Sequence, residues 1–202
     1  MRLGLYGGTF DPVHYGHLLL AEQCREQCRL DAVWFLPSGL PPHKQGAAIT
    51  DGKRRLEMLE LAVAGHPEFA VNGLELERSG PTFTVDTLQQ LHDEQPEREL
   101  FFLIGADSLV EFPTWRSPER IAELATLVAV NRGGQPQPDL TTVREQLGDE
   151  FVSRIQFVTM PGLDLASREM RGRIHADRSI RFMTPRSVEM YIEQHGLYRD
   201  AP

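Results

Sequence analysis

One short stretch near the start of the chain, residues 7–17, most strongly limits how this sequence can fold. Before it, residues 2–6 form a short apolar run bounded by glycine, which is typical of a buried strand. After it, residues 18–24 predict a helix. Backbone N–H groups and a helix N-terminus face a phosphate in this arrangement, and glycine lets the backbone approach the ligand closely. The stretch therefore predicts a strand–turn–helix unit that binds an anion.

Two histidines, His14 and His17, lie in the first turn of that expected helix, where residues three apart are neighbours. Imidazole groups at this place can donate hydrogen bonds to phosphate oxygens as charge develops in a transition state. A glycine pair after a strand is often only a tight turn, and a single histidine is usually a surface or capping residue. The combination of strand, glycine pair, Thr-Phe-x-Pro and His-x-Gly-His is far more specific than its parts, and it favours a functional site.

Length and charge narrow the class of protein. A chain of 202 residues can build one sizeable core, and one domain is the default expectation. The formal net charge is −8, from 21 basic and 29 acidic residues, which argues against a general nucleic-acid binder. It does not exclude small anionic ligands, because a few arginines are enough to hold a phosphate.

The sequence also indicates where the protein resides. It has no apolar run of the ~18 residues that a membrane span requires, and the N-terminus enters a strand without the pattern of a signal peptide. Cys24 and Cys28 are spaced i,i+4 on an expected helix, which matches neither a Cys-x-x-Cys pair nor a zinc site. We therefore expect two reduced thiols in a cytoplasmic protein that has no membrane partner.

Strand and helix patterns alternate along the whole chain. Apolar or alternating runs predict further strands at 32–37, 69–72 with 74–77, 100–104, 127–132 and 155–160. Amphipathic or capped stretches predict helices at 53–64, after Thr82 or Thr84, and at 118–125, 142–147, from Ser167 and from Thr184. This alternation predicts an α/β fold: a Rossmann-like, doubly wound parallel sheet with helices on both faces. We expect one domain over residues 1–202, with a small helical part from about residue 167.

Ligands bind beyond the carboxyl ends of the strands in such sheets. Polar stretches follow the expected strands at 7–17, 37–44, 105–108 and 132, and a fifth begins the helix at 167–171. Five polar stretches that converge on one rim indicate a ligand site.

The first motif resembles the signature of the nucleotidyltransferase superfamily, and further segments narrow the resemblance. These segments are Pro-Ser-Gly-Leu-Pro-Pro-His-Lys at 37–44, Pro-Thr-Phe-Thr-Val-Asp-Thr-Leu at 81–88, Gly-Ala-Asp-Ser at 105–108, Phe-Pro-Thr-Trp at 112–115 and Gly-Leu-Tyr at 196–198. They cover nearly the whole chain in the family's order. The sequence is similar to the bacterial nicotinate-nucleotide adenylyltransferases.

This resemblance implies the transfer of AMP from ATP to nicotinate mononucleotide. The acceptor's own phosphate is the nucleophile, so no covalent enzyme intermediate is expected, and catalysis rests on positioning and charge stabilisation. His14 and His17 would donate to oxygens of the α- and β-phosphates. Mg²⁺ would be carried by the ATP phosphates, and we expect no metal ligand from the protein.

The resemblance also assigns roles residue by residue. The ATP-binding residues would be Gly7, Gly8, Thr9, Phe10, Gly105, Asp107 and Ser167. Asp107 would lie near the ribose, and Lys44 would approach the phosphates as a further catalytic residue. Thr84, Trp115 and Arg132 would bind the nicotinate nucleotide, with Trp115 stacking on the pyridine ring.

One segment departs from the family pattern. The family usually has Ser-Ser-Thr-x-x-Arg at the start of the late helix, whereas residues 166–171 here are Ala-Ser-Arg-Glu-Met-Arg. We expect Ser167 to cap that helix and Arg171 to act as a catalytic residue on the triphosphate. Arg168 would replace the lost hydroxyl with a charge-assisted contact.

Other functions stay open at this point. Pantetheine-phosphate adenylyltransferases favour Thr at the position of His14, and a nicotinamide-mononucleotide enzyme differs only in accepting an amide. An NAD-dependent oxidoreductase would need Gly-x-Gly-x-x-Gly after the first strand, which is missing. A non-enzymatic nucleotide sensor would not need the histidine pair.

Overall fold

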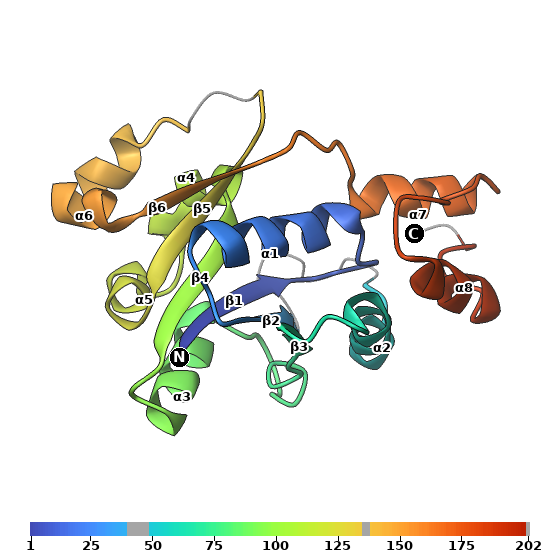
Figure 1. Cartoon of the computed structure of the whole chain (residues 1–202), viewed down its shortest axis with the longest axis horizontal. Helices are drawn as coiled ribbons and strands as arrows, with labels where there is room; N and C mark the ends of the chain where they lie inside the picture. Colours follow the sequence, from blue (N-terminus) through green and yellow to red (C-terminus); the bar gives the residue numbers. More distant parts are fainter. Residues whose placement is uncertain (40–48, 135–137, 201–202) are drawn as a thin grey trace.

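A computed structural model describes residues 1–39, 49–134 and 138–200, and within them six strands form a single sheet. The strands are β1 (Arg2–Gly8), β2 (Ala32–Pro37), β3 (Phe69–Val71), β4 (Glu99–Gly105), β5 (Thr126–Arg132) and β6 (Gln156–Met160). Their order is β3-β2-β1-β4-β5-β6, and all neighbouring pairs are parallel (Figure 1). The predicted doubly wound parallel sheet is confirmed, and its order reverses between β1 and β4.

Helices cover both faces of the sheet. The helical elements are α1 (Tyr15–Gln27), α2 (Gly52–Val63), α3 (Thr84–Glu94), α4 (Ala106–Glu111), η2 (Phe112–Thr114), α5 (Pro118–Leu124), α6 (Thr141–Arg154), α7 (Ser167–His175) and α8 (Arg186–Gln194). One core cluster takes apolar side chains from α1, α2, α7 and α8. A second cluster, on the opposite face, takes them from α3, α4, η2 and α5.

The alternation of β4 shows how one strand serves both cores. Phe101 and Leu103 belong to the cluster under α1 and α2, whereas Phe102 and Ile104 belong to the cluster under α3 and α5. A strand that is apolar at every position is therefore expected for a sheet covered on both sides. This explains why residues 100–104 could be assigned to a strand with little ambiguity.

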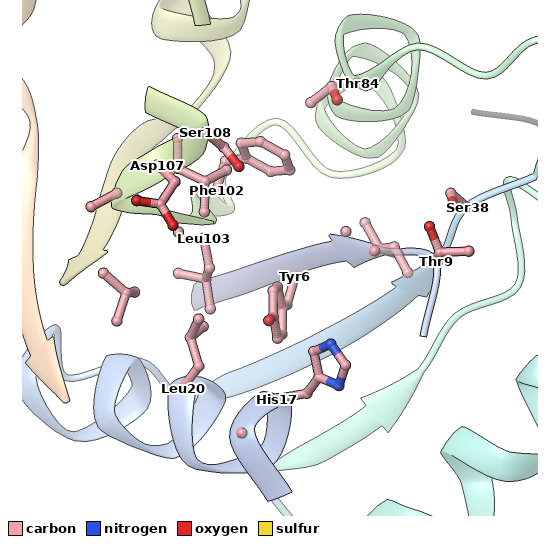
Figure 2. A pocket seen from close by; sticks show the side chains of 18 of the residues that line it. Tyr6, Thr9, His17, Leu20, Ser38, Thr84, Phe102, Leu103, Asp107 and Ser108 are labelled. Carbon is pink, nitrogen blue, oxygen red and sulfur yellow. The ribbon is translucent and has the colours of Figure 1, made fainter. Parts of the chain in front are cut away.

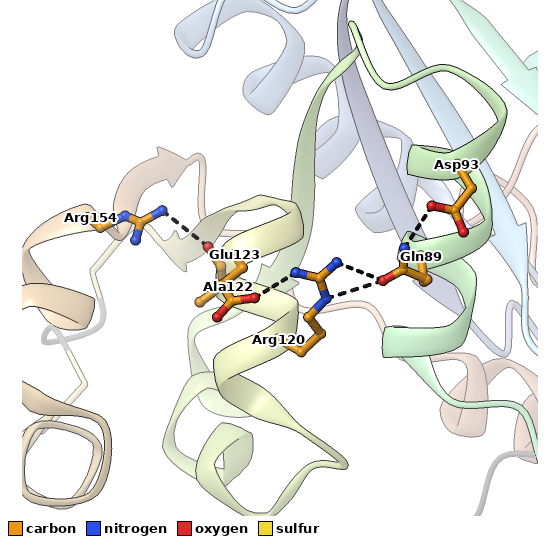
Figure 3. Close-up of polar contacts among 6 residues, drawn as sticks. All are labelled: Gln89, Asp93, Arg120, Ala122, Glu123 and Arg154. Carbon is orange, nitrogen blue, oxygen red and sulfur yellow. Dashed lines mark hydrogen bonds and ion pairs between the residues drawn. The ribbon is translucent and has the colours of Figure 1, made fainter.

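Polar contacts fix α3 and α5 to each other on their outer side (Figure 3). The guanidinium of Arg120 donates two hydrogen bonds to Oε1 of Gln89, at 3.1 and 2.9 Å, and a third to Glu123 at 2.6 Å. Arg154 at the end of α6 donates to the carbonyl of Ala122 at 3.2 Å. These contacts fix α3 and α6 to α5, which lies between them in the hydrogen-bond network.

Several predicted elements differ from the structure. Residues 74–77 form turns instead of a strand, and β3 stops at Val71. The break expected at 105–108 is the start of α4, which begins directly after β4. The helix expected at 142–147 extends over Thr141–Arg154, with Gly148 in a non-helical conformation inside it.

Helix starts were predicted better in position than in capping. The helix α7 begins at Ser167 as expected, but Ala166 occupies the N-cap and the Ser167 hydroxyl bonds elsewhere. The N-cap of α3 is Phe83, so neither expected threonine caps it. Gly196 directly follows the C-cap of α8, His195, and has a φ of +61°, a conformation that glycine commonly adopts after a helix.

The helices α7 and α8 lie together at one end of the molecule, next to α2 and the start of α1 (Figure 1). Cys24 and Cys28 are both buried and free. In the described part of the chain, none of the helices has the length and apolarity that a membrane crossing requires.

Candidate active site

A cavity of about 800 Å³ opens beyond the carboxyl ends of β1 and β4, at the place where the strand order reverses. The ends of β1, β2, β4, β5 and β6 contribute to its walls, together with the first turns of α1, α3, α4 and α7. The site residues predicted from the sequence that line it are Gly7, Gly8, Thr9, His14, His17, Thr84, Gly105, Asp107, Trp115, Arg132 and Ser167. The structure thus brings together polar stretches that lie up to 160 positions apart in the sequence, from Gly7 to Ser167.

Three parts of the cavity wall are visible in Figure 2, which shows His17 on the α1 side, Thr84 from α3 across from it, and Asp107 at the start of α4. Tyr6 lies beside His17, with their ring centroids 6.1 Å apart. The cavity therefore has a histidine side and an α3 side, with the start of α4 between them.

The histidine pair is held by the first turn of α1. His14 is the N-cap, and its backbone N–H donates to Nδ1 of His17 at 3.2 Å. The two rings stack with centroids 3.7 Å apart and an interplanar angle of 20°. Since Nδ1 of His17 accepts a hydrogen bond, a neutral ring carries its proton on Nε2 and is a donor there. Nδ1 of His14 is buried and has no partner among the described residues.

Both imidazoles are neutral at pH 7. Burial lowers the pKa of His14 to about 4, and the positive charge of Arg132 acts in the same direction. Burial also lowers the pKa of His17 well below its usual value, with His14 and Arg132 as further causes. The charge of Arg132 acts on both rings, which means that this arginine lies near the histidines. Its charge is therefore placed to attract an anion to the histidine side of the cavity.

The α3 side of the cavity is aromatic. Trp115 packs edge-on against Phe102, at a centroid distance of 5.9 Å, and tilted against Phe112 at 5.4 Å. The guanidinium of Arg116 lies 4.6 Å from the ring centroid of Phe83, and both residues line the cavity. No role was assigned from the sequence to Phe83, which lies within the segment 81–88, or to Arg116, which directly follows the segment 112–115.

A buried carboxylate, Glu75, also lines the cavity and was missed because its segment was assigned to a strand. The Thr87 hydroxyl donates to Glu75 at 2.8 Å, and Arg78 in turn donates to the Thr87 oxygen at 2.8 Å. Burial raises the pKa of Glu75, and the hydrogen bond from Thr87 opposes that shift. This network connects the turn at 74–77 to the start of α3.

A buried arginine supports the floor of the cavity. Arg55 on α2 is only 2% exposed, and its guanidinium donates to the carbonyls of Thr9, Ser38 and Thr50 at 2.8, 2.8 and 2.9 Å. Thr9 and Ser38 both line the cavity. Arg55 therefore fixes two neighbouring wall segments to α2.

Four residues that were given a role from the sequence are not in the cavity wall that the structure describes. The ring of Phe10 is buried and packs edge-on against His17, 5.0 Å away, so it supports the histidine from behind. Arg171 donates to the backbone carbonyl of Asp11 at 2.6 Å, and Arg168 beside it is exposed. Lys44 lies outside the described residues.

No group of three or more His, Cys, Asp or Glu side chains with the spacing of a metal site occurs in the described ranges. The Ser167 hydroxyl lies at the cavity but donates to the carbonyl of Pro12 at 2.8 Å. The polar side chains of the cavity wall are two imidazoles, two guanidinium groups, several hydroxyls and the carboxylates of Glu75 and Asp107. The imidazoles, Arg132 and the backbone N–H groups on the histidine side suit an anionic ligand.

Comparisons with known proteins agree with this geometry. The model of the cytidylyltransferase-like family matches residues 5–170. A protein of Thermomicrobium roseum named "probable nicotinate-nucleotide adenylyltransferase" is 46% identical over 198 residues, which cover 98% of this chain and 92% of the relative. A Thermus thermophilus protein of the same name is 45% identical and is covered completely by the match, which takes in 98% of this chain.

Solved structures show the same fold. The nicotinic acid mononucleotide adenylyltransferase of Plasmodium falciparum, complexed with NaAD, superposes with a TM-score of 0.80. The match covers 98% of this chain and 97% of that chain at 19% sequence identity. The same enzyme complexed with APC gives a TM-score of 0.79. At this identity the likeness supports the arrangement of sheet and helices.

Proposed function

This chain belongs to the cytidylyltransferase-like family and, within it, to the nicotinate-nucleotide adenylyltransferases, and we propose how its cavity carries out their reaction. The enzyme transfers AMP from ATP to nicotinate mononucleotide and produces nicotinate adenine dinucleotide and pyrophosphate. The reaction contributes to NAD biosynthesis. Two nucleotides must bind side by side in this reaction, and the cavity has a volume of about 800 Å³.

In the proposed mechanism, a phosphate oxygen of nicotinate mononucleotide attacks the α-phosphorus of ATP. The new P–O bond forms as the bond between the α-phosphorus and the α,β-bridging oxygen breaks, and pyrophosphate leaves with that oxygen. The nucleophile is already ionised, so no side chain has to be activated and no covalent enzyme intermediate forms. The protein contributes alignment and stabilisation of the charge on the phosphate oxygens.

The neutral histidine pair is the observation that supports this mechanism most strongly. The Nε2–H of His17 is a fixed donor, because its Nδ1 is occupied by the backbone N–H of His14. A neutral imidazole needs no counter-ion before the substrate binds, and it can donate its hydrogen bond without a change of protonation state. His14 stacks on it, and Arg132 adds positive charge to the same side. We place the triphosphate on this side of the cavity.

The remaining cavity residues fit the two nucleosides. The backbone of Gly7, Gly8 and Thr9 lines the cavity at the end of β1, and Asp107 lines it at the start of α4. Asp107 would bind the adenosine ribose. Thr84 and Trp115 would frame the pyridine ring. Mg²⁺ would enter as part of the substrate, bound to phosphate oxygens of ATP.

The test is pyrophosphate release from ATP and Mg²⁺ with nicotinate mononucleotide, nicotinamide mononucleotide and phosphopantetheine offered in parallel. We expect a strong preference for nicotinate mononucleotide. We also expect His17→Ala to lower kcat by roughly 10²–10³-fold, the usual effect of removing one donor to a developing charge. Release with phosphopantetheine or the amide instead would identify one of the related transferases. An unchanged kcat in His17→Ala would refute the role of the histidine pair.

A further inference from the structure

The loop that joins β1 to α1, residues 9–14, is held by residues 167–198 near the end of the chain, which contain α7 and α8 and are called the helical part below. Five hydrogen bonds connect that part to the loop or to the first residue of α1. They run from Ser167 to the Pro12 carbonyl (2.8 Å), from Arg171 to the Asp11 carbonyl (2.6 Å), from Thr184 to the Val13 carbonyl (2.8 Å), from Tyr198 to the Asp11 carboxylate (2.7 Å) and from the Tyr15 N–H to the Met183 carbonyl (3.0 Å).

These contacts satisfy backbone groups that no regular element reaches. The carbonyls of three consecutive residues, Asp11, Pro12 and Val13, each accept a hydrogen bond from a side chain of the helical part. Asp11 and Val13 are buried, so an unpaired polar group there would be costly. Phe10, which precedes them, has a φ of +49°, a conformation that needs support from its surroundings. The shape of the loop therefore depends on residues 167–198.

The Tyr198–Asp11 contact is the one that reaches the loop side chain. Asp11 is 4% exposed; its Oδ1 accepts the Tyr198 hydroxyl and its Oδ2 accepts the backbone N–H of Thr50 at 3.2 Å. The positive charge of Arg55 faces the same carboxylate, and that of Arg171 acts on Tyr198. The carboxylate is thus fixed from two sides, three residues before His14.

We propose that Tyr198 is a positioning residue of the transferase: through Asp11 it sets the loop geometry that aligns His14 and His17 with the reacting phosphates. The proposal rests on the function assigned above to the histidine pair. It also gives Arg171 a second role beside the expected contact with the triphosphate, since its guanidinium holds the same residue from its carbonyl side.

The chain offers a matched control on α8. The hydroxyl of Tyr191 contacts Arg54 and Glu57 on α2, so it also joins the helical part to the rest of the protein. It makes no described contact with the loop. Replacing either tyrosine with phenylalanine removes one hydroxyl and keeps the ring, which separates an effect on the loop from a general loosening of the helical part.

The experiment compares Tyr198→Phe with Tyr191→Phe in steady-state kinetics. We expect Tyr198→Phe to lower kcat at least tenfold while the KM values for both substrates change less than twofold, because a misaligned donor is felt mainly in the transition state. Tyr191→Phe should leave kcat within twofold. Equal kcat values for the two variants, or a loss confined to KM, would overturn the proposal. Thr184→Val, which removes the bond to Val13, is a second variant with the same expectation.

A double-mutant cycle tests whether the tyrosine acts through the histidines. In a His17→Ala background, Tyr198→Phe should lower kcat by clearly less than it does in the wild type, because one of the two rings that it positions is gone. A further tenfold loss would show that Tyr198 acts by another route.

A measurement without substrate keeps the inference separate from the proposed function. The ring NMR signals of His14 and His17 should shift in Tyr198→Phe and stay in place in Tyr191→Phe. If the wild-type protein released no pyrophosphate with any acceptor, the proposed function would fail, and the NMR comparison would still decide whether Tyr198 sets the histidine geometry. Unshifted signals in Tyr198→Phe would reject it.

Discussion

Replacing Arg55 with methionine tests how much the buried guanidinium contributes to stability. Methionine has a similar length and packs in apolar surroundings, but it has no donor. The substitution leaves three carbonyls, of Thr9, Ser38 and Thr50, without the hydrogen bonds that Arg55 donates at 2.8–2.9 Å. It also removes the positive charge that faces the Asp11 carboxylate.

The magnitude follows from opposing effects. A polar group left unsatisfied costs about 1–3 kcal/mol when it is fully buried, so three carbonyls set an upper range of about 3–9 kcal/mol. The residues that carry them are partly exposed, so water can replace part of the loss. Burial lowers the pKa of Arg55, which shows that the native state already bears a desolvation cost for this charge. Methionine recovers part of that cost. We therefore expect a net loss near the lower end, about 3 kcal/mol, or about 6–12 °C in the midpoint of thermal unfolding for a chain of this size.

Urea and thermal unfolding followed by circular dichroism measure this loss. The control is Arg54→Met, next along α2, where the arginine side chain is 40% exposed and contacts the ring and hydroxyl of Tyr191. It should shift the midpoint far less. Arg55→Lys keeps the charge but cannot reach three carbonyls at once, so it should fall between the two. If Arg55→Met and Arg54→Met unfolded at the same midpoint, the reasoning about the buried carbonyls would be refuted.

Three further outcomes follow from the site. The pKa of His14 is about 4 in the folded protein and 6.5 without perturbation, so the unfolded chain binds more protons between these pH values. The free energy of unfolding should therefore fall by roughly 3 kcal/mol as the pH drops from 6.5 to 4. Urea unfolding across that range should show a weaker dependence of this free energy on pH in His14→Asn than in the wild type. Gly39→Ala places a Cβ 2.7 Å from the Glu75 carbonyl oxygen, so it should lower the unfolding midpoint and raise the KM for nicotinate mononucleotide; a variant that matches the wild type in both assays would contradict this. Trp115→Ala should raise the KM for nicotinate mononucleotide more than the KM for ATP, with partial recovery in Trp115→Phe; equal increases for both substrates would place the ring elsewhere.

Local patterns were sufficient for most of the fold. The run at 32–37 predicted the bounds of β2, since six apolar residues between polar ones leave few alternatives. The run at 74–77 failed because Leu and Glu alternate there as they would in a half-buried strand. In the structure Glu75 is buried at the cavity, while Leu74 and Leu76 are partly exposed. Glu75 is thus buried although the alternating pattern predicts that its side chain is exposed, and such exceptions are common at functional sites.

The site was predictable where its geometry is local. The glycine pair and the histidines lie within one strand–turn–helix unit, so the pattern of residues 7–17 was enough to predict that they belong to one site. Contacts between distant residues could not be predicted from one sequence. The resemblance assigned Arg171 to the triphosphate, and the structure adds a contact that the sequence could not show, the hydrogen bond to the Asp11 carbonyl, 160 positions away. The contacts of Arg55 with Thr9 and Ser38 were missed for the same reason.

The loop at 9–14 is synthesised early and completed late. Its four side-chain contacts with the helical part span 155, 160, 171 and 187 positions. A nascent chain that has left the ribosome through β5 can already pair β1, β2, β3, β4 and β5, because those strands are adjacent in the sheet. The carbonyls of the loop, in contrast, must stay hydrated until α7 and α8 emerge and dock. The order of translation therefore puts the anchors of the loop last: the loop can take its final shape only when residues 167–198 have been added to the chain.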